Sequence, residues 1–97
     1  MITLEQLRAE YKPQIMELAK KYGMSNIRVF GSVARGDADE KSDVDLLYTP
    51  IPPNGLWEAA GMLYDLEELL KTKVDFVCAE RLRDRIKNRV FSEAQPL

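Results

Sequence analysis

The chain has 97 residues, of which 45% are apolar and 31% charged, and its formal net charge is −2. This length and composition predict one soluble globular domain over residues 1–97 without a membrane span, and the charge does not indicate a general nucleic-acid binder. The absence of histidine and the single cysteine, Cys78, exclude imidazole chemistry, His-ligated zinc and an internal disulfide, and they suit the reducing cytoplasm.

The first predicted element is a helix over residues 3–22, whose apolar residues recur every three or four positions. The N-terminus lacks the basic and apolar regions of a signal peptide. Thr3 is the expected N-cap, and Gly23 is the expected stop. Pro13 lies inside the pattern and predicts either a kink or a second helix that starts near Lys12.

A short β-rich run over residues 27–30 predicts the first strand, and the polar residues 33–42 predict a turn or short helical start followed by a loop. Residues 43–49 predict the second strand, and a proline-rich loop follows. Residues 56–72 predict an amphipathic helix, with a cap near Asn54 and an apolar stripe formed by Leu56, Ala59, Ala60, Leu63, Leu66 and Leu70. Residues 73–79 predict the third strand, and residues 81–94 predict the last helix. The order predicts an α/β (α+β) domain with a three-stranded mixed sheet and packed helices.

Two carboxylates stand inside the predicted second strand. Asp43 and Asp45 are two residues apart, so they should project from the same face with Cα atoms roughly 6.5–7 Å apart. The alternate residues, Val44, Leu46 and Tyr48, should pack against helices. Because paired carboxylates repel one another and resist desolvation, solvent or a bound cation must compensate their charge, and Mg²⁺ prefers such oxygen ligands. The alternative is a solvated acidic loop that runs into a strand edge.

A third acid and a glycine-containing turn extend this pattern. Asp75 lies inside the third predicted strand, and it can join the pair if that strand neighbours the second. Three carboxylates can hold two metal ions about 3.5–4 Å apart. Gly31 permits unusual dihedral angles, and a helical turn from Ser32 to Arg35 would present N–H donors and a hydroxyl to an anion. A phosphate site beside a metal site indicates phosphoryl or nucleotidyl transfer.

Two other motifs can be excluded. The spacing from Gly31 to Gly36 is that of a P-loop, but the Lys-Ser/Thr that should follow is absent. The acidic stretch from Asp37 fails as an EF-hand, because Ser42 stands where glycine is required and Tyr48 stands where the bidentate glutamate is required.

The sequence Gly31-Ser32, ten residues, Asp43-Val44-Asp45 resembles the G-S-x10-D-x-D signature of the polymerase-β-like nucleotidyltransferase superfamily. The chain length and the residues around this motif resemble those of the minimal nucleotidyltransferase (MNT) family, the antitoxin half of HEPN–MNT toxin–antitoxin pairs. The resemblance implies ATP as substrate, Mg²⁺ in a site for one or two metals, and the fold of that superfamily. It implies Asp43, Asp45 and Asp75 as catalytic metal ligands and Gly31 and Ser32 as nucleotide contacts.

The same resemblance implies a protein adenylyltransferase that silences a HEPN toxin by transferring AMP to it, in a hetero-oligomer, with a homodimer left open. No direct nucleic-acid binding is implied. A binding-only antitoxin that masks its toxin sterically is the alternative. An autonomous transferase for small molecules is disfavoured, because the chain has no room for an added acceptor domain.

Some residues keep two interpretations. Arg35 and Lys41 flank the motif and are candidates for nucleotide contact, with ordinary surface charge as the alternative. Trp57 and Tyr64 are predicted to lie in the core or at its margin, and otherwise in a partner interface. The basic run from Arg81 to Arg89 predicts a solvated helix face, or else a contact with a partner or phosphate.

Overall fold

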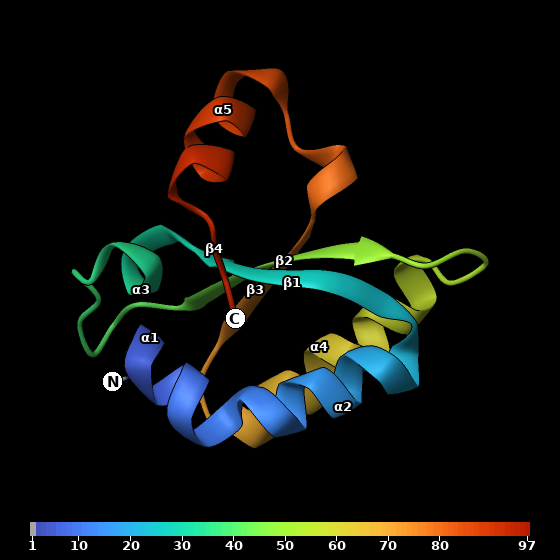
Figure 1. Cartoon of the computed structure of the whole chain (residues 1–97), viewed down its shortest axis with the longest axis horizontal. Coiled ribbons are helices and arrows are strands. Elements are labelled where there is room, and N and C mark those ends of the chain that lie inside the picture. Colours follow the sequence, from blue (N-terminus) through green and yellow to red (C-terminus); the bar gives the residue numbers. More distant parts are fainter. Residues whose placement is uncertain (1) are drawn as a thin grey trace.

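The computed structural model describes residues 2–97 and consists of a sheet with helices on both faces (Figure 1). The chain begins with α1 (Leu4–Gln6), a π-helical turn (Leu7–Tyr11) and α2 (Lys12–Tyr22). The following elements are β1 (Met24–Phe30), α3 (Gly31–Arg35), β2 (Val44–Pro50), α4 (Leu56–Leu70), β3 (Val74–Cys78), a 3-10 turn (Ala79–Arg81), α5 (Asp84–Glu93) and β4 (Gln95–Pro96). Among these helices, none is long and apolar enough to cross a membrane.

The sheet is mixed, as predicted, but it has four strands in the order β3-β2-β1-β4. β2 runs antiparallel to β1 and parallel to β3, and α4 makes the crossover between β2 and β3. The expectation of three strands is wrong because β4 also pairs with β1. β4 has only two residues, one of them a proline, which is too short to produce an alternating pattern in the sequence.

The N-terminal helical segment is divided where the proline predicted it. The Thr3 side chain caps α1 by accepting a hydrogen bond from the Gln6 N–H at 3.1 Å. Pro13 is the second residue of α2, where its missing N–H has no partner to lose. Gly23 ends α2 in the left-handed conformation, with φ of 71°. The second interpretation of Pro13, a new helix starting near Lys12, is therefore confirmed.

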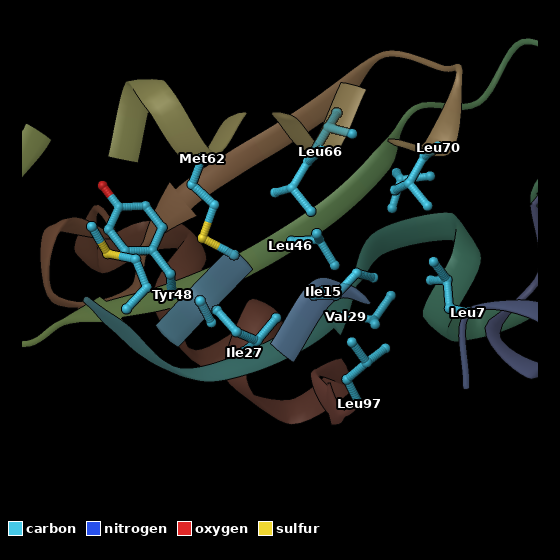
Figure 2. Close-up of a cluster of buried hydrophobic side chains, with 14 of the residues drawn as sticks. Leu7, Ile15, Ile27, Val29, Leu46, Tyr48, Met62, Leu66, Leu70 and Leu97 are labelled. Atoms are coloured by element: carbon cyan, nitrogen blue, oxygen red, sulfur yellow. The ribbon is translucent and has the colours of Figure 1, made fainter. Parts of the chain in front are cut away.

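The main hydrophobic core lies between the sheet and the layer formed by α2 and α4 (Figure 2). Leu46 and Tyr48 of β2 point into it together with Ile15 of α2 and Leu66 of α4. Val44 belongs to the same core, so the predicted inward face of β2 is confirmed. A smaller cluster forms on the opposite face, where α5 packs over β2, and its buried members are Leu47, Ala79 and Val90. The two faces of β2 therefore have different neighbours.

The cap of α4 lies beside Asn54, as predicted: Gly55 is the N-cap, and Glu58 accepts from its N–H at 2.7 Å, while the Asn54 side chain donates to the Ile51 carbonyl. One expectation about α4 is wrong. Trp57 and Tyr64 do not lie in the core, because both side chains are largely exposed. The helix buries the stripe Ala59, Met62, Leu66 and Leu70 instead, which turns the two aromatic residues to the opposite side.

Candidate functional site

The two acids of the motif lie at the start of β2, on the face that carries α5. Asp43 directly precedes the strand rather than lying inside it, and Asp45 is the second strand residue. Since Val44 and Leu46 are buried in the main core, Asp45 points to the opposite face of the sheet. Both carboxylates are partly buried. Asp45 therefore lies on the face that carries α5, and the charge of Asp43 acts on it.

β3 brings the third acid to the same place. β3 is the parallel neighbour of β2, and Asp75 pairs in register with Asp45. Adjacent strands lie about 4.8 Å apart, so these two residues stand side by side. Asp75 itself is exposed. The sequence predicted that Asp75 joins the two acids if its strand neighbours β2. The pairing of β3 with β2 meets this condition.

The electrostatics of this face are concentrated on Asp45. Burial, together with the negative charges of Asp75 and Asp43, raises the pKa of the Asp45 carboxyl to about 6, and Arg35 opposes this shift. A carboxylate in this position is most stable when a proton or a cation neutralises it. Across residues 2–97, however, no three acidic or sulfur side chains converge on one point as a ready cation cage. Further oxygen ligands from substrate or water would be needed to complete a Mg²⁺ shell, which is the usual arrangement for this ion.

Gly31 is a close neighbour of Asp45 from the other half of the motif. Its φ of 72° is unfavourable for residues with a side chain. A Cβ atom at this position would also collide with the Oδ2 atom of Asp45. Phe30 pairs in register with Asp45, so the β1–α3 turn begins beside the carboxylate. Glycine is therefore required here both by the backbone and by the space that Asp45 occupies.

α3 opens directly at this turn, and Ser32 is its second residue. No side chain caps the helix at Phe30, so the first N–H groups keep their capacity to bind an anion. The predicted helical turn after Gly31 is thus confirmed, and it sets N–H donors beside the carboxylates. This arrangement suits a phosphate chain whose other side is held by a cation.

The two predicted basic contacts have different surroundings. Arg35 donates from Nη1 to Glu93 Oε2 at 2.7 Å and from Nε to Asp37 Oδ2 at 3.3 Å. These contacts raise the pKa of the guanidinium and connect α3 to α5. Lys41 is an exposed residue of the loop before β2, and its backbone N–H donates to Asp39. Nucleotide contact by Arg35 or Lys41 stays a prediction.

Glu93 is a site residue that sequence reasoning missed. It lies at the end of α5, its side chain is only 14% exposed, and its charge also raises the pKa of Asp45. Nothing in the local pattern around residue 93 distinguishes it from an ordinary helix acid. Only the return of α5 over the sheet brings it to Arg35 and Asp45.

A pocket of about 470 Å³ lies apart from the acids. It is lined on one side by the N-terminal residues and on the other by α3, and its members include Leu4, Arg8, Val33 and Arg35. Of the described residues that line it, none is Asp43, Asp45 or Asp75. The three acids therefore lie outside this pocket.

Comparison with known proteins shows similarity to nucleotidyltransferases in both sequence and structure. The sequence profile of the nucleotidyltransferase domain matches residues 13–97. The protein adenylyltransferase MntA of Thermococcus cleftensis is 37% identical over 95 residues, which cover 96% of this chain and 94% of that protein. A solved structure described as a minimal nucleotidyltransferase has a TM-score of 0.85 at 41% identity and covers 99% of this chain and 97% of its own. A chain from a toxin–antitoxin crystal structure with AMP-PNP shares the fold, with a TM-score of 0.74 at 18% identity over 89% of this chain and 71% of that chain.

Proposed function

The chain belongs to the nucleotidyltransferase domain family, and from that premise we propose that it is a Mg²⁺-dependent protein adenylyltransferase that acts as an antitoxin. Its substrate is ATP, and its acceptor is a HEPN-type toxin partner in the cytoplasm. Residues 1–97 form a single minimal nucleotidyltransferase domain in this proposal. The activity in the name of the Thermococcus cleftensis relative supports protein adenylylation. A toxin partner is supported more weakly, by the toxin–antitoxin complex of the same fold.

One observation carries the proposal: the in-register pair Asp45 and Asp75 stands beside a glycine turn that opens a helix. Asp43, Asp45 and Asp75 offer the hard oxygen ligands that Mg²⁺ prefers. The raised pKa of Asp45, to about 6, indicates that its charge lacks compensation in the protein alone. The donor set therefore fits a hard divalent cation such as Mg²⁺.

In the proposed reaction each residue has a distinct task. Gly31 allows the triphosphate to approach the backbone, and the Ser32 hydroxyl and the first N–H groups of α3 bind its outer phosphates. Asp43, Asp45 and Asp75 would hold Mg²⁺, which when bound would neutralise charge on the phosphates. Asp75 is also the exposed carboxylate that accepts the proton of the acceptor hydroxyl. The hydroxyl oxygen attacks the α-phosphorus, and the bond to the β-phosphate oxygen breaks as pyrophosphate leaves toward Ser32.

Transfer to a protein also agrees with the exposure of Asp75, which leaves room for a bulky acceptor to approach this carboxylate. A toxin side chain that carries a hydroxyl meets this requirement. Adding AMP to an RNA-cleaving toxin would place a negative phosphate where RNA phosphates must bind, which opposes RNA binding.

The test is to incubate this chain with the toxin encoded beside it, ATP and Mg²⁺, and to measure the intact mass of the toxin. One or more added AMP masses are expected. The double variant Asp43→Asn/Asp45→Asn should add none, whereas Glu40→Gln, at an exposed loop acid, should behave as wild type. If wild type adds no mass and the double variant still neutralises the toxin, the protein is a binding-only antitoxin.

A further inference from the structure

The outer face of α4 exposes an apolar surface that the proposed reaction does not use. Trp57 is 88% exposed, Tyr64 66% and Leu56 60%. Ala60 is exposed between the two aromatic residues. We call this surface the outer α4 stripe (Leu56, Trp57, Ala60 and Tyr64). Exposed Trp and Tyr side chains are typical of sites where a few residues supply most of a binding energy.

The segment that carries the stripe is poor in charge up to Tyr64. Residues 51–64 contain one charged residue, Glu58, although 31% of the whole chain is charged. That carboxylate is occupied, because it accepts a hydrogen bond from the Gly55 N–H at 2.7 Å. The charges that follow Tyr64 begin with three acids, Asp65, Glu67 and Glu68. Since charged residues are depleted in the core of protein interfaces and acids repel phosphates, an apolar protein surface fits this face and nucleic acid does not.

The spacing within the stripe indicates what that surface is. Trp57 and Tyr64 are seven residues apart, about two helical turns or 10 Å, with small Ala60 between them. We infer that this stripe joins two copies of the chain, with their α4 helices packed antiparallel about a twofold axis beside Ala60. In that arrangement Trp57 of each copy meets Tyr64 of the other, and the small residue at the axis lets the helices approach.

The exposed area suits a weak dimer. The exposed parts of Leu56, Trp57 and Tyr64 amount to about 450 Å² per copy. Two copies together would bury about 900 Å², which is in the range of weak, transient interfaces. The dimer is therefore expected to dissociate at micromolar rather than nanomolar concentration.

The position of α4 favours a second copy over the toxin as occupant, an argument that rests on the proposed function. α2 and α4 cover one face of the sheet, and α5 lies over the other (Figure 1). Asp45 points to the α5 face, because its neighbours Val44 and Leu46 are buried in the main core. A toxin seated on α4 would be separated from Asp45 of the same subunit by a helix layer and the sheet, about 20 Å. In an α4–α4 dimer, both acidic faces point outward and stay accessible to the acceptor.

The dimer can be measured on the full chain without ATP, Mg²⁺ or toxin, so its outcome is independent of the transferase assay. Sedimentation equilibrium between about 1 and 500 μM should show a monomer–dimer equilibrium. Trp57→Ala should raise the dissociation constant by at least about 30-fold, and Arg85→Ala on α5 should leave it unchanged. Since Trp57 is the only tryptophan, its fluorescence should shift to the blue as the protein is concentrated.

A cysteine at the proposed axis gives a second readout that does not depend on a weakened variant. Ala60→Cys should form an intermolecular disulfide under mild oxidation, whereas Arg85→Cys should not, and the native Cys78 is buried. The proposal is overturned if the chain stays monomeric at 500 μM with unshifted fluorescence and the Ala60→Cys variant forms no cross-link. It is also overturned by a monomeric chain whose capture of the toxin is abolished by Trp57→Ala, because the stripe would then belong to the toxin interface.

Discussion

Replacing Asp45 by asparagine should stabilise the metal-free protein, although it removes a residue of the proposed active site. Burial and the charges of Asp75 and Asp43 raise the pKa of the Asp45 carboxyl from 3.8 to about 6. Two pKa units correspond to at most about 3 kcal/mol, and solvent screening of this partly exposed group reduces the figure to about 1–2 kcal/mol. Asparagine keeps the shape beside Gly31 and removes the charge. For a domain of this size, the Tm should rise by roughly 5–12 °C at pH 7.

The pH dependence gives the sharper test. Because the folded-state pKa is raised, the folded protein binds more protons than the unfolded chain between about pH 3.8 and 6. The penalty from the Asp45 charge is therefore absent below pH 3.8, grows as the pH rises through this window, and is complete above pH 6. The advantage of Asp45→Asn should follow the same course. Thermal melts by circular dichroism in EDTA, from about pH 3.5 to 8, measure it.

Glu40→Gln provides the matched control, since it removes an exposed loop carboxylate without relieving the acidic face. Its Tm should follow that of wild type at every pH. If Asp45→Asn is instead less stable than wild type at pH 7, the carboxylate has a structural role and its charge is not the source of strain. A stabilisation that persists unchanged below pH 3.8 would also refute the reasoning, because the charge is then absent.

Three other results are expected. Gly31→Ala should lower the free energy of unfolding by about 1–2 kcal/mol and abolish AMP transfer, because it strains the left-handed backbone and displaces Asp45. Gly55→Ala is the control, because a Cβ there meets nothing within 4 Å, and equal losses in both variants would contradict the steric argument. Glu93→Gln should raise KM for ATP, because Arg35 loses its charged partner at 2.7 Å. Steady-state kinetics with an unchanged KM would count against this role. The affinity for ATP in the presence of Mg²⁺, measured by calorimetry, should increase as the pH rises through about 6, because Asp45 must lose its proton to hold a cation. An affinity that does not change with pH would argue against Asp45 as a ligand.

The features predicted best from the sequence are those that depend on neighbours along the chain. The Thr3 cap, the helix start at Pro13 and the Gly23 stop follow from local backbone chemistry, and all three are confirmed. The alternation of Val44, Leu46 and Tyr48 with the acids likewise indicated which face of β2 is buried. The Gly31 turn and the nearby carboxylates lie on one β1–α3–β2 segment, so their proximity required no knowledge of distant pairing.

Features that depend on distant pairing could not be predicted in the same way. The place of Asp75 beside Asp45 required the parallel register of β2 and β3, which could be stated from the sequence only as a condition. β4 and Glu93 acquire partners only when the α5 segment returns over the sheet. The exposure of Trp57 could not be predicted, because large aromatic residues are usually buried, and the stripe buried on α4 includes Met62 instead.

The in-register pairing of Asp45 with Asp75 makes the length of the connection between their strands part of the site. Side chains alternate between the faces of a strand, so a slip of one residue in β3 would set Val74 or Phe76 opposite Asp45. Asp75 would then turn toward the main core, and the valine or phenylalanine would turn toward the acidic face. The length of α4 and its flanking loops therefore decides which β3 residue lies beside Asp45, because a one-residue change of register would move the Asp75 carboxylate to the opposite face of the sheet.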